Sequence, residues 1–224
     1  MNSASNIGPL LSLAPLAAAF IALACPSLAN AAGDAEQEEW NTGFQTTYSW
    51  QHHPGFNAAY FSENSLDDEG GTLYTFSATA SAGVRPWHGG ELYLDLELVK
   101  GSPFTGDLVG LGGFTNGEIS HVGDSAATAY LQRLFLRQTW NQGNGSERVE
   151  TGPNQLAGIV DSNRVVLTVG NFSVLDIFAG NELAGDSRTQ FMNWSNSAYA
   201  AYDHAADVRG FGWGFAVEVY HNDW

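Results

Sequence analysis

Two carboxylates, Asp95 and Glu97, are the first residues whose types and spacing suggest chemistry. In an extended strand, side chains two positions apart share a face and lie about 7 Å apart. That separation is close to the carboxylate spacing of an inverting glycosidase. Carboxylates at positions i and i+2 are also common on any strand that faces water. The pair is therefore weak evidence for a hydrolase, which remains the least favoured interpretation.

Other catalytic and metal-binding motifs are missing from the sequence. The six histidines include one adjacent pair, His52 and His53, but no H-E-x-x-H spacing. The glycine-rich stretch 110–117 lacks the lysine of a phosphate-binding loop and precedes no clear helix. No serine stands in a G-x-S-x-G motif. The sequence thus predicts a protein that is not an enzyme and holds no metal and no cofactor.

The stretch 89–100, which carries Asp95 and Glu97, is predicted to form a strand with two contrasting faces. Its even positions are Leu92, Leu94, Leu96 and Leu98, and its odd positions are Glu91, Tyr93, Asp95 and Glu97. A soluble β-sandwich would bury the leucines against a second sheet. A membrane barrel would turn them to lipid and the carboxylates to water. The rest of the chain has to decide between these two architectures.

The composition and the N-terminus indicate an exported protein. The apolar run 10–24 precedes Ala29-Asn30-Ala31, an A-x-A cleavage site, so residues 1–31 are predicted to be a signal peptide. The only cysteine, Cys25, lies within that segment, and export without disulfides fits a Gram-negative envelope. The net charge of −16 argues against binding a nucleic-acid backbone. No later stretch offers the apolar length of a membrane helix, so a mature membrane protein would have to be a closed barrel.

Alternating segments predict about seven strands after an N-terminal periplasmic segment, 32–43. The expected strands are 44–50, 73–84, 89–100, 130–140, 165–172, 199–206 and 213–220. The connections after the first, third and fifth strands are long, whereas those after the second and sixth are tight turns. Outer-membrane barrels alternate in this way, but the connection 141–163 is long where a short turn is expected.

Aromatic side chains at the predicted strand ends also favour a barrel, because such proteins carry aromatic girdles at both membrane interfaces. These residues are Trp50, Trp87, Tyr130, Trp140, Trp213 and Tyr220. Aromatic residues would also fill the core of a sandwich, and a secreted β-sandwich that binds glycans therefore stays open as the alternative fold and function. The sequence predicts an all-β, antiparallel transmembrane β-barrel, with 44–224 as its partial barrel domain.

Short sequence runs, in order along almost the whole mature chain, add a family resemblance. They include Trp50-Gln51 with His53-Pro54, Gly89-Gly90-Glu91-Leu92-Tyr93, Arg133-Leu134-Phe135-Leu136-Arg137-Gln138, Asn154-Gln155-Leu156-Ala157-Gly158 and Arg188-Thr189-Gln190-Phe191. In these runs the chain resembles the carbohydrate-selective porins, the glucose porins of Gram-negative outer membranes. The resemblance implies a sixteen-stranded barrel, of which this chain is the N-terminal part; a complete small barrel stays open as the alternative. It also implies passive diffusion of glucose-like sugars across the outer membrane.

The side chains expected to line the pore follow from strand alternation. They are Glu91, Tyr93, Asp95, Glu97, Arg133, Phe135, Arg137, Glu218 and Tyr220. Acids facing arginines would order water and bind sugar hydroxyls, and aromatic rings would stack on a pyranose. Alternatively, Arg133 and Arg137 form a structural ladder with the acids of 89–100, which requires those two strands to pair. The expected partners are mono- or oligosaccharides and outer-membrane lipid; the sequence leaves open both a monomer and a homotrimer.

Overall fold

The chain folds into long antiparallel strands. The computed structural model describes residues 37–60, 65–102, 104, 116, 119, 125–178, 190, 206–207 and 209–221. The 3-10 helix η3 (Val174–Asp176) follows β7. The strands are β1 (Trp40–His53), β2 (Gly71–Trp87), β3 (Gly90–Gly101), β4 (Thr128–Asn141), β5 (Ser146–Val149), β6 (Gly158–Asp161), β7 (Arg164–Phe172) and β8 (Gly212–Tyr220).

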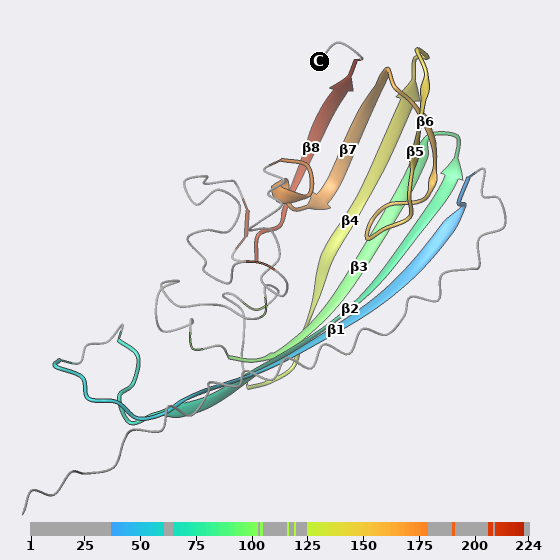
Figure 1. Ribbon diagram of the computed structural model, residues 1–224. Helices are drawn as coiled ribbons and strands as arrows, with labels where there is room; N and C mark the ends of the chain where they lie inside the picture. The colour runs from blue at the N-terminus through green and yellow to red at the C-terminus, as the bar shows by residue number, and fades with distance from the viewer. Residues whose placement is uncertain are drawn as a thin grey trace, which may run out of the picture.

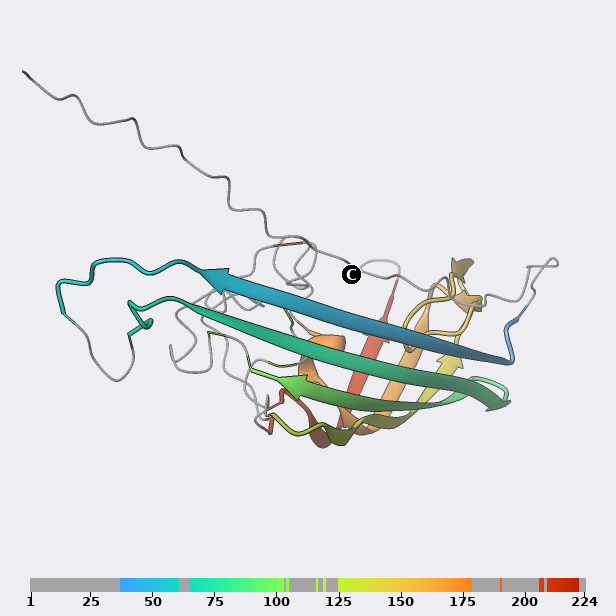
Figure 2. The same ribbon diagram turned by 90° about the horizontal axis from the view of Figure 1, so that it is seen from below.

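Six of these strands form one curved sheet. Their order is β1-β2-β3-β4-β7-β8, and each neighbouring pair is antiparallel. Strands β5 and β6 form a separate two-stranded sheet that lies, with η3, on the inner side of the curve (Figures 1 and 2). The all-β, antiparallel prediction is confirmed. Within the described residues the sheet is open, with β1 and β8 as its edges.

The two faces of the sheet differ as the alternation in β3 predicts. Its leucines point outward and are between 37% (Leu94) and 51% (Leu96) exposed. The intervening side chains point inward, and Asp95 and Glu97 are only 2% and 3% exposed. A sandwich would cover the leucines, but no second sheet lies on them in the described part of the chain. A continuous apolar face of this kind fits lipid better than water.

Tryptophan and tyrosine side chains mark both ends of the outer face. Trp40, Trp87 and Trp140 are exposed at the end that carries the tight β2–β3 turn, and Trp50, Tyr74 and Trp213 at the opposite end. The strand from Trp40 to Trp50 spans about 33 Å. At a tilt of about 40° this gives a height of about 25 Å, which matches the apolar band of an outer-membrane barrel.

The structure corrects several details of the sequence prediction. Tyr130 and Tyr220 lie inside rather than in the girdles, since each packs against an inward-facing arginine. Strand β1 begins at Trp40, before the expected start at 44. The connection 141–163 is not only turn, because it contains β5 and β6. The expected strand 199–206 lies outside the described residues except for Ala206. None of the helical segments described here is long and apolar enough to cross a membrane.

Candidate functional site

The inner face of β3 and β4 carries a ladder of opposite charges. These strands pair in a register that sets Asp95 opposite Arg133, and Glu91 opposite Arg137. Nη1 of Arg133 lies 3.2 Å from a carboxylate oxygen of Asp95, and Nη1 of Arg137 lies 3.7 Å from Glu91. The pairing that the structural-ladder interpretation requires is therefore present. Which of these charged side chains a solute can reach depends on the other contacts that each of them makes.

A β-bulge in β4 adds a residue to this ladder. The register shifts between Asp95 and Leu96, and Leu96 pairs with Leu131. The extra residue lets both Gln132 and Arg133 reach acids on β3. The Gln132 amide donates to Glu97 at 3.2 Å, while Arg133 donates to Asp95. Strict alternation does not predict Gln132, because it places only every second residue on the inner face.

Asp95 is a buried support rather than an exposed ligand. It accepts hydrogen bonds from Nη1 of Arg133 at 3.2 Å and from the side-chain amide of Asn154 at 2.8 Å. Arg133 in turn makes a bidentate contact with Asp176 of η3, at 2.8 Å from Nε and 2.7 Å from Nη2. The Arg133 and Asp176 side chains remain 18% and 28% exposed. Arg133 and Asp176, and not Asp95, are therefore the members of this group of charges that are exposed on the inner face.

Glu91 joins a second group of charges nearer the short-turn end. It lies 2.7 Å from Nη2 of Arg85 and accepts a 2.8 Å hydrogen bond from the Tyr93 hydroxyl. The Arg137 guanidinium lies over the rings of Tyr93 and Phe135, at 5.3 and 5.4 Å from their centroids. The Arg137 side chain is 23% exposed, so it is the most accessible of these cations. Sequence reasoning missed Arg85 because the expected strand ended at residue 84, whereas β2 continues to Trp87.

The aromatic rings of Tyr93 and Phe135 belong to a buried core cluster. The two ring centroids lie 5.0 Å apart, and the cluster consists of Tyr93, Phe135, Leu156, Phe172 and Ala216. Tyr93 also lies over Gly83, where an added Cβ would come within 2.7 Å of the ring. Both rings were expected to be open for stacking on a sugar. In the described part of the chain they pack against protein instead.

Glu97 lies apart from these groups, toward the long-loop end. It forms a short ion pair with Arg209, whose guanidinium stacks over Tyr130 at 3.9 Å. Asp207 fixes the turn by accepting hydrogen bonds from the backbone amides of Arg209 and Phe211. Glu97 and Asp95 are therefore both buried and both paired with arginine. Such a pair offers no open carboxylates to a glycoside, which argues against the hydrolase interpretation.

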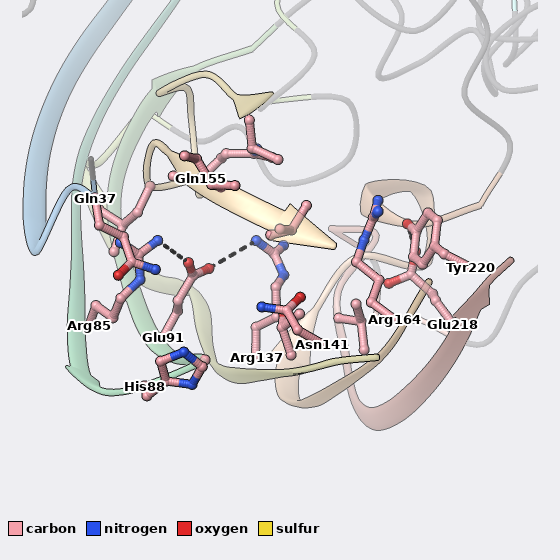
Figure 3. A pocket seen from close by; sticks show the side chains of 18 of the residues that line it. Gln37, Arg85, His88, Glu91, Arg137, Asn141, Gln155, Arg164, Glu218 and Tyr220 are labelled. Carbon is pink, nitrogen blue, oxygen red and sulfur yellow. Dashed lines mark hydrogen bonds and ion pairs between the residues drawn. The ribbon is translucent and has the colours of Figure 1, made fainter. Parts of the chain in front are cut away.

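The remaining predicted residues, Glu218 and Tyr220, border a cavity at the short-turn end of the inner face (Figure 3). The cavity holds about 320 Å³, and Glu91 and Arg137 lie on its other side. The Tyr220 hydroxyl donates to Glu218 at 2.7 Å, and Arg164 lies 3.8 Å from the Tyr220 ring centroid. Tyr220 is 38% exposed and is thus an accessible aromatic surface of the site. Among the described residues, no group of three or more His, Cys, Asp or Glu side chains could hold a metal ion.

Comparison with known proteins adds one match. Residues 63–224 match a family model described as "Carbohydrate-selective porin, OprB family". The matched range includes all nine side chains expected from the sequence to line a pore. No curated protein and no solved structure matches the chain.

Proposed function

We propose, from the premise that this chain belongs to the carbohydrate-selective porin, OprB family, that its inner face lines a water-filled path for glucose-like sugars. Membership makes the chain an outer-membrane porin for carbohydrates, and such porins act as channels without bond chemistry. The observation that carries the finer proposal is the contrast between the two faces of the sheet. The outer face is continuous and apolar, while the inner face presents paired charges that are partly open.

Paired charges suit neutral sugars better than ions. A sugar hydroxyl both donates and accepts, so it fits beside a guanidinium and a carboxylate that are already neighbours. Arg133 with Asp176 and Arg137 with Glu91 supply two such pairs. Arg133 with its two acids carries one excess negative charge and Glu91 with its two arginines one excess positive charge, so the two groups together carry none. A solute in passive diffusion must also bind weakly enough to leave. Asp95 holds Arg133 in place from behind, which limits the cost of ordering that side chain when a sugar arrives.

Tyr220 supports the proposal from the opposite wall of the cavity. Tyr220 is 38% exposed, with Arg164 over one face of its ring, whereas Tyr93 and Phe135 are 1% and 3% exposed. The faces of pyranose rings are apolar enough to stack on an aromatic side chain, and the Glu218 carboxylate beside Tyr220 accepts hydrogen bonds. The cavity of about 320 Å³ lies at the small end of ligand sites, which suits a sugar of one or two rings.

Replacing Tyr220 by leucine is expected to weaken the block of channel current by glucose about fivefold, or about 1 kcal/mol, because an aromatic contact is lost. The measurement is the glucose concentration that halves ion conductance in planar bilayers containing the intact protein. Tyr48→Leu is the matched control, since Tyr48 lies exposed on the outer face of β1. A wild-type protein that conducts no ions, or that glucose does not block, would refute the proposed function.

We also propose that residues 1–31 are a signal peptide removed during export. The support is the apolar run followed by Ala29-Asn30-Ala31. The mature protein isolated from outer membranes is expected to begin at Ala32, which mass spectrometry of its N-terminal peptide measures. A mature protein that keeps Met1 or any residue of the apolar run would contradict this assignment.

A further inference from the structure

The segment between β4 and β7 is much longer than the sheet requires. Asn141 and Arg164 pair directly across the ladder, so a two-residue turn could join the two strands. The β2–β3 connection at the same end is such a tight turn. Residues 142–163 instead return along the inner side of the sheet as the β5–β6 hairpin, whose tip, residues 150–157, joins β5 to β6 (Figure 1). Because a two-residue turn would connect the two strands, this inward path points to a role other than connection.

The tip is fastened to the wall through side chains of β3 and β4. The backbone amide of Leu156 donates to the Tyr93 hydroxyl at 3.0 Å, and the Asn154 amide donates to Asp95 at 2.8 Å. Arg137 donates to the Asn154 carbonyl at 3.0 Å. The Leu156 side chain, 2% exposed, packs into the core cluster with Tyr93. The tip is therefore a packed part of the wall, not a loose loop.

The N-terminal segment fastens the tip from its other side. The Glu38 amide donates to the Ala157 carbonyl at 2.9 Å, and the Ala157 amide donates to the Glu38 carboxylate at 2.7 Å. Arg85 donates to the Glu38 carbonyl as well, and the Asn41 amide donates to the Gln155 carbonyl at 3.1 Å. Residues before β1 thus hold a segment more than a hundred positions away in the chain.

The local sequence fixes the shape of the tip. Gly152 and Gln155 form two reciprocal backbone hydrogen bonds, at 3.0 and 3.1 Å, that close a four-residue turn. Pro153 occupies its second position, and Asn154 its third, with a left-handed φ of 53°. Proline favours the second position of such a turn, and asparagine tolerates the left-handed region at the third. The turn thereby aims the Asn154 side chain at Asp95.

The hairpin is also one wall of the cavity. Gln155, Leu156 and Ile159 of the hairpin border it, and so do Arg137, Arg164 and Tyr220 of the sheet. The gap between the hairpin and the sheet limits what the cavity can admit. We propose that the hairpin is the element of the pore that limits the size of the sugars admitted, held in place by Tyr93, Asn154 and Glu38. This inference rests on the proposed function and adds the residues that set the size limit.

The test compares sugars of increasing length in liposome swelling with the intact protein. In one variant Asn-Gly replaces residues 142–163, which joins Asn141 to Arg164 by a two-residue hairpin turn. The second variant, Tyr93→Phe with Asn154→Gly and Glu38→Ala, removes three side-chain anchors of the tip and keeps at position 154 a residue that accepts a positive φ. The ratio of the trisaccharide rate to the monosaccharide rate is expected to rise at least about twofold in both, because the path widens.

Glu150→Gln is the matched control, because Glu150 lies in the hairpin but pairs only with the exposed Arg148 among the contacts described. It is expected to leave the ratio unchanged. Unchanged ratios in the folded variants would overturn the inference; if the shortened variant does not fold, the point variant alone decides. Failure of the proposed function gives a different result, because liposomes that contain the wild-type protein would then admit no monosaccharide at all.

Discussion

Replacing Arg209 by alanine is expected to destabilise the folded protein by about 3–5 kcal/mol, because it breaks a buried ion pair with the Glu97 carboxylate. The two side chains are 6% and 1% exposed, so water cannot take over the lost contact. Gln132 remains as a hydrogen-bond donor to Glu97, but a neutral amide does not balance the charge. The measurement is the free energy of unfolding in urea, with the protein reconstituted in lipid vesicles.

A double variant separates the ion pair from simple packing. Glu97→Gln in the Arg209→Ala background removes the carboxylate charge of the broken pair and is expected to recover most of the lost stability. Arg148→Ala serves as the control, since Arg148 pairs with Glu150 on the surface and such pairs contribute at most about 1 kcal/mol. If Arg209→Ala costs less unfolding free energy than such a surface pair contributes, the buried ion pair does not stabilise the fold. The same holds if the double variant recovers no stability.

Arginine in place of Leu94 is expected to cost about 2–4 kcal/mol of unfolding free energy in lipid, because a charge near the middle of the bilayer loses its hydration. Leu94 points outward from the central part of β3 and neighbours Ala82 and Leu134 on the adjacent strands. The same lipid-vesicle unfolding experiment measures this cost.

Val84→Arg is the depth control for this prediction. Val84 also points outward, but it pairs with Trp40 at the end of the sheet, where an arginine reaches the interface and costs at most about 1 kcal/mol. If arginine costs the same unfolding free energy at Leu94 and at Val84, the outer face does not span the apolar layer of a membrane. In that case the barrel interpretation would fail, whatever the channel measurements show.

The direction of most side chains could be predicted from the sequence. Period-two alternation places Leu94 and Asp95 on opposite faces, and the structure agrees. Alternation carries this information because it depends only on strand geometry. Alternation does not show which other parts of the chain pack against a face of the sheet. Tyr93 points inward as expected, yet Leu156, from a distant part of the chain, covers it.

Three features of the site could not be predicted from the sequence. The bulge at Gln132 breaks the period by one residue without any glycine or proline to signal it. Strands β5 and β6 have four residues each, too short for alternation to be recognised in a polar segment. Arg209 was assigned to a turn, and its partner Glu97 lies 112 positions away. The bulge and the Arg209–Glu97 pair depend on contacts between distant parts of the chain rather than on local pattern.

The inward position of the β5–β6 hairpin has a consequence for biogenesis. The hairpin leaves and rejoins the sheet at Asn141 and Arg164, and its tip is held by Glu38, which lies 119 positions from Ala157 in the chain. Contacts between such distant parts of a chain form slowly. We therefore expect docking of the hairpin against the sheet to be a slow step in the maturation of this protein.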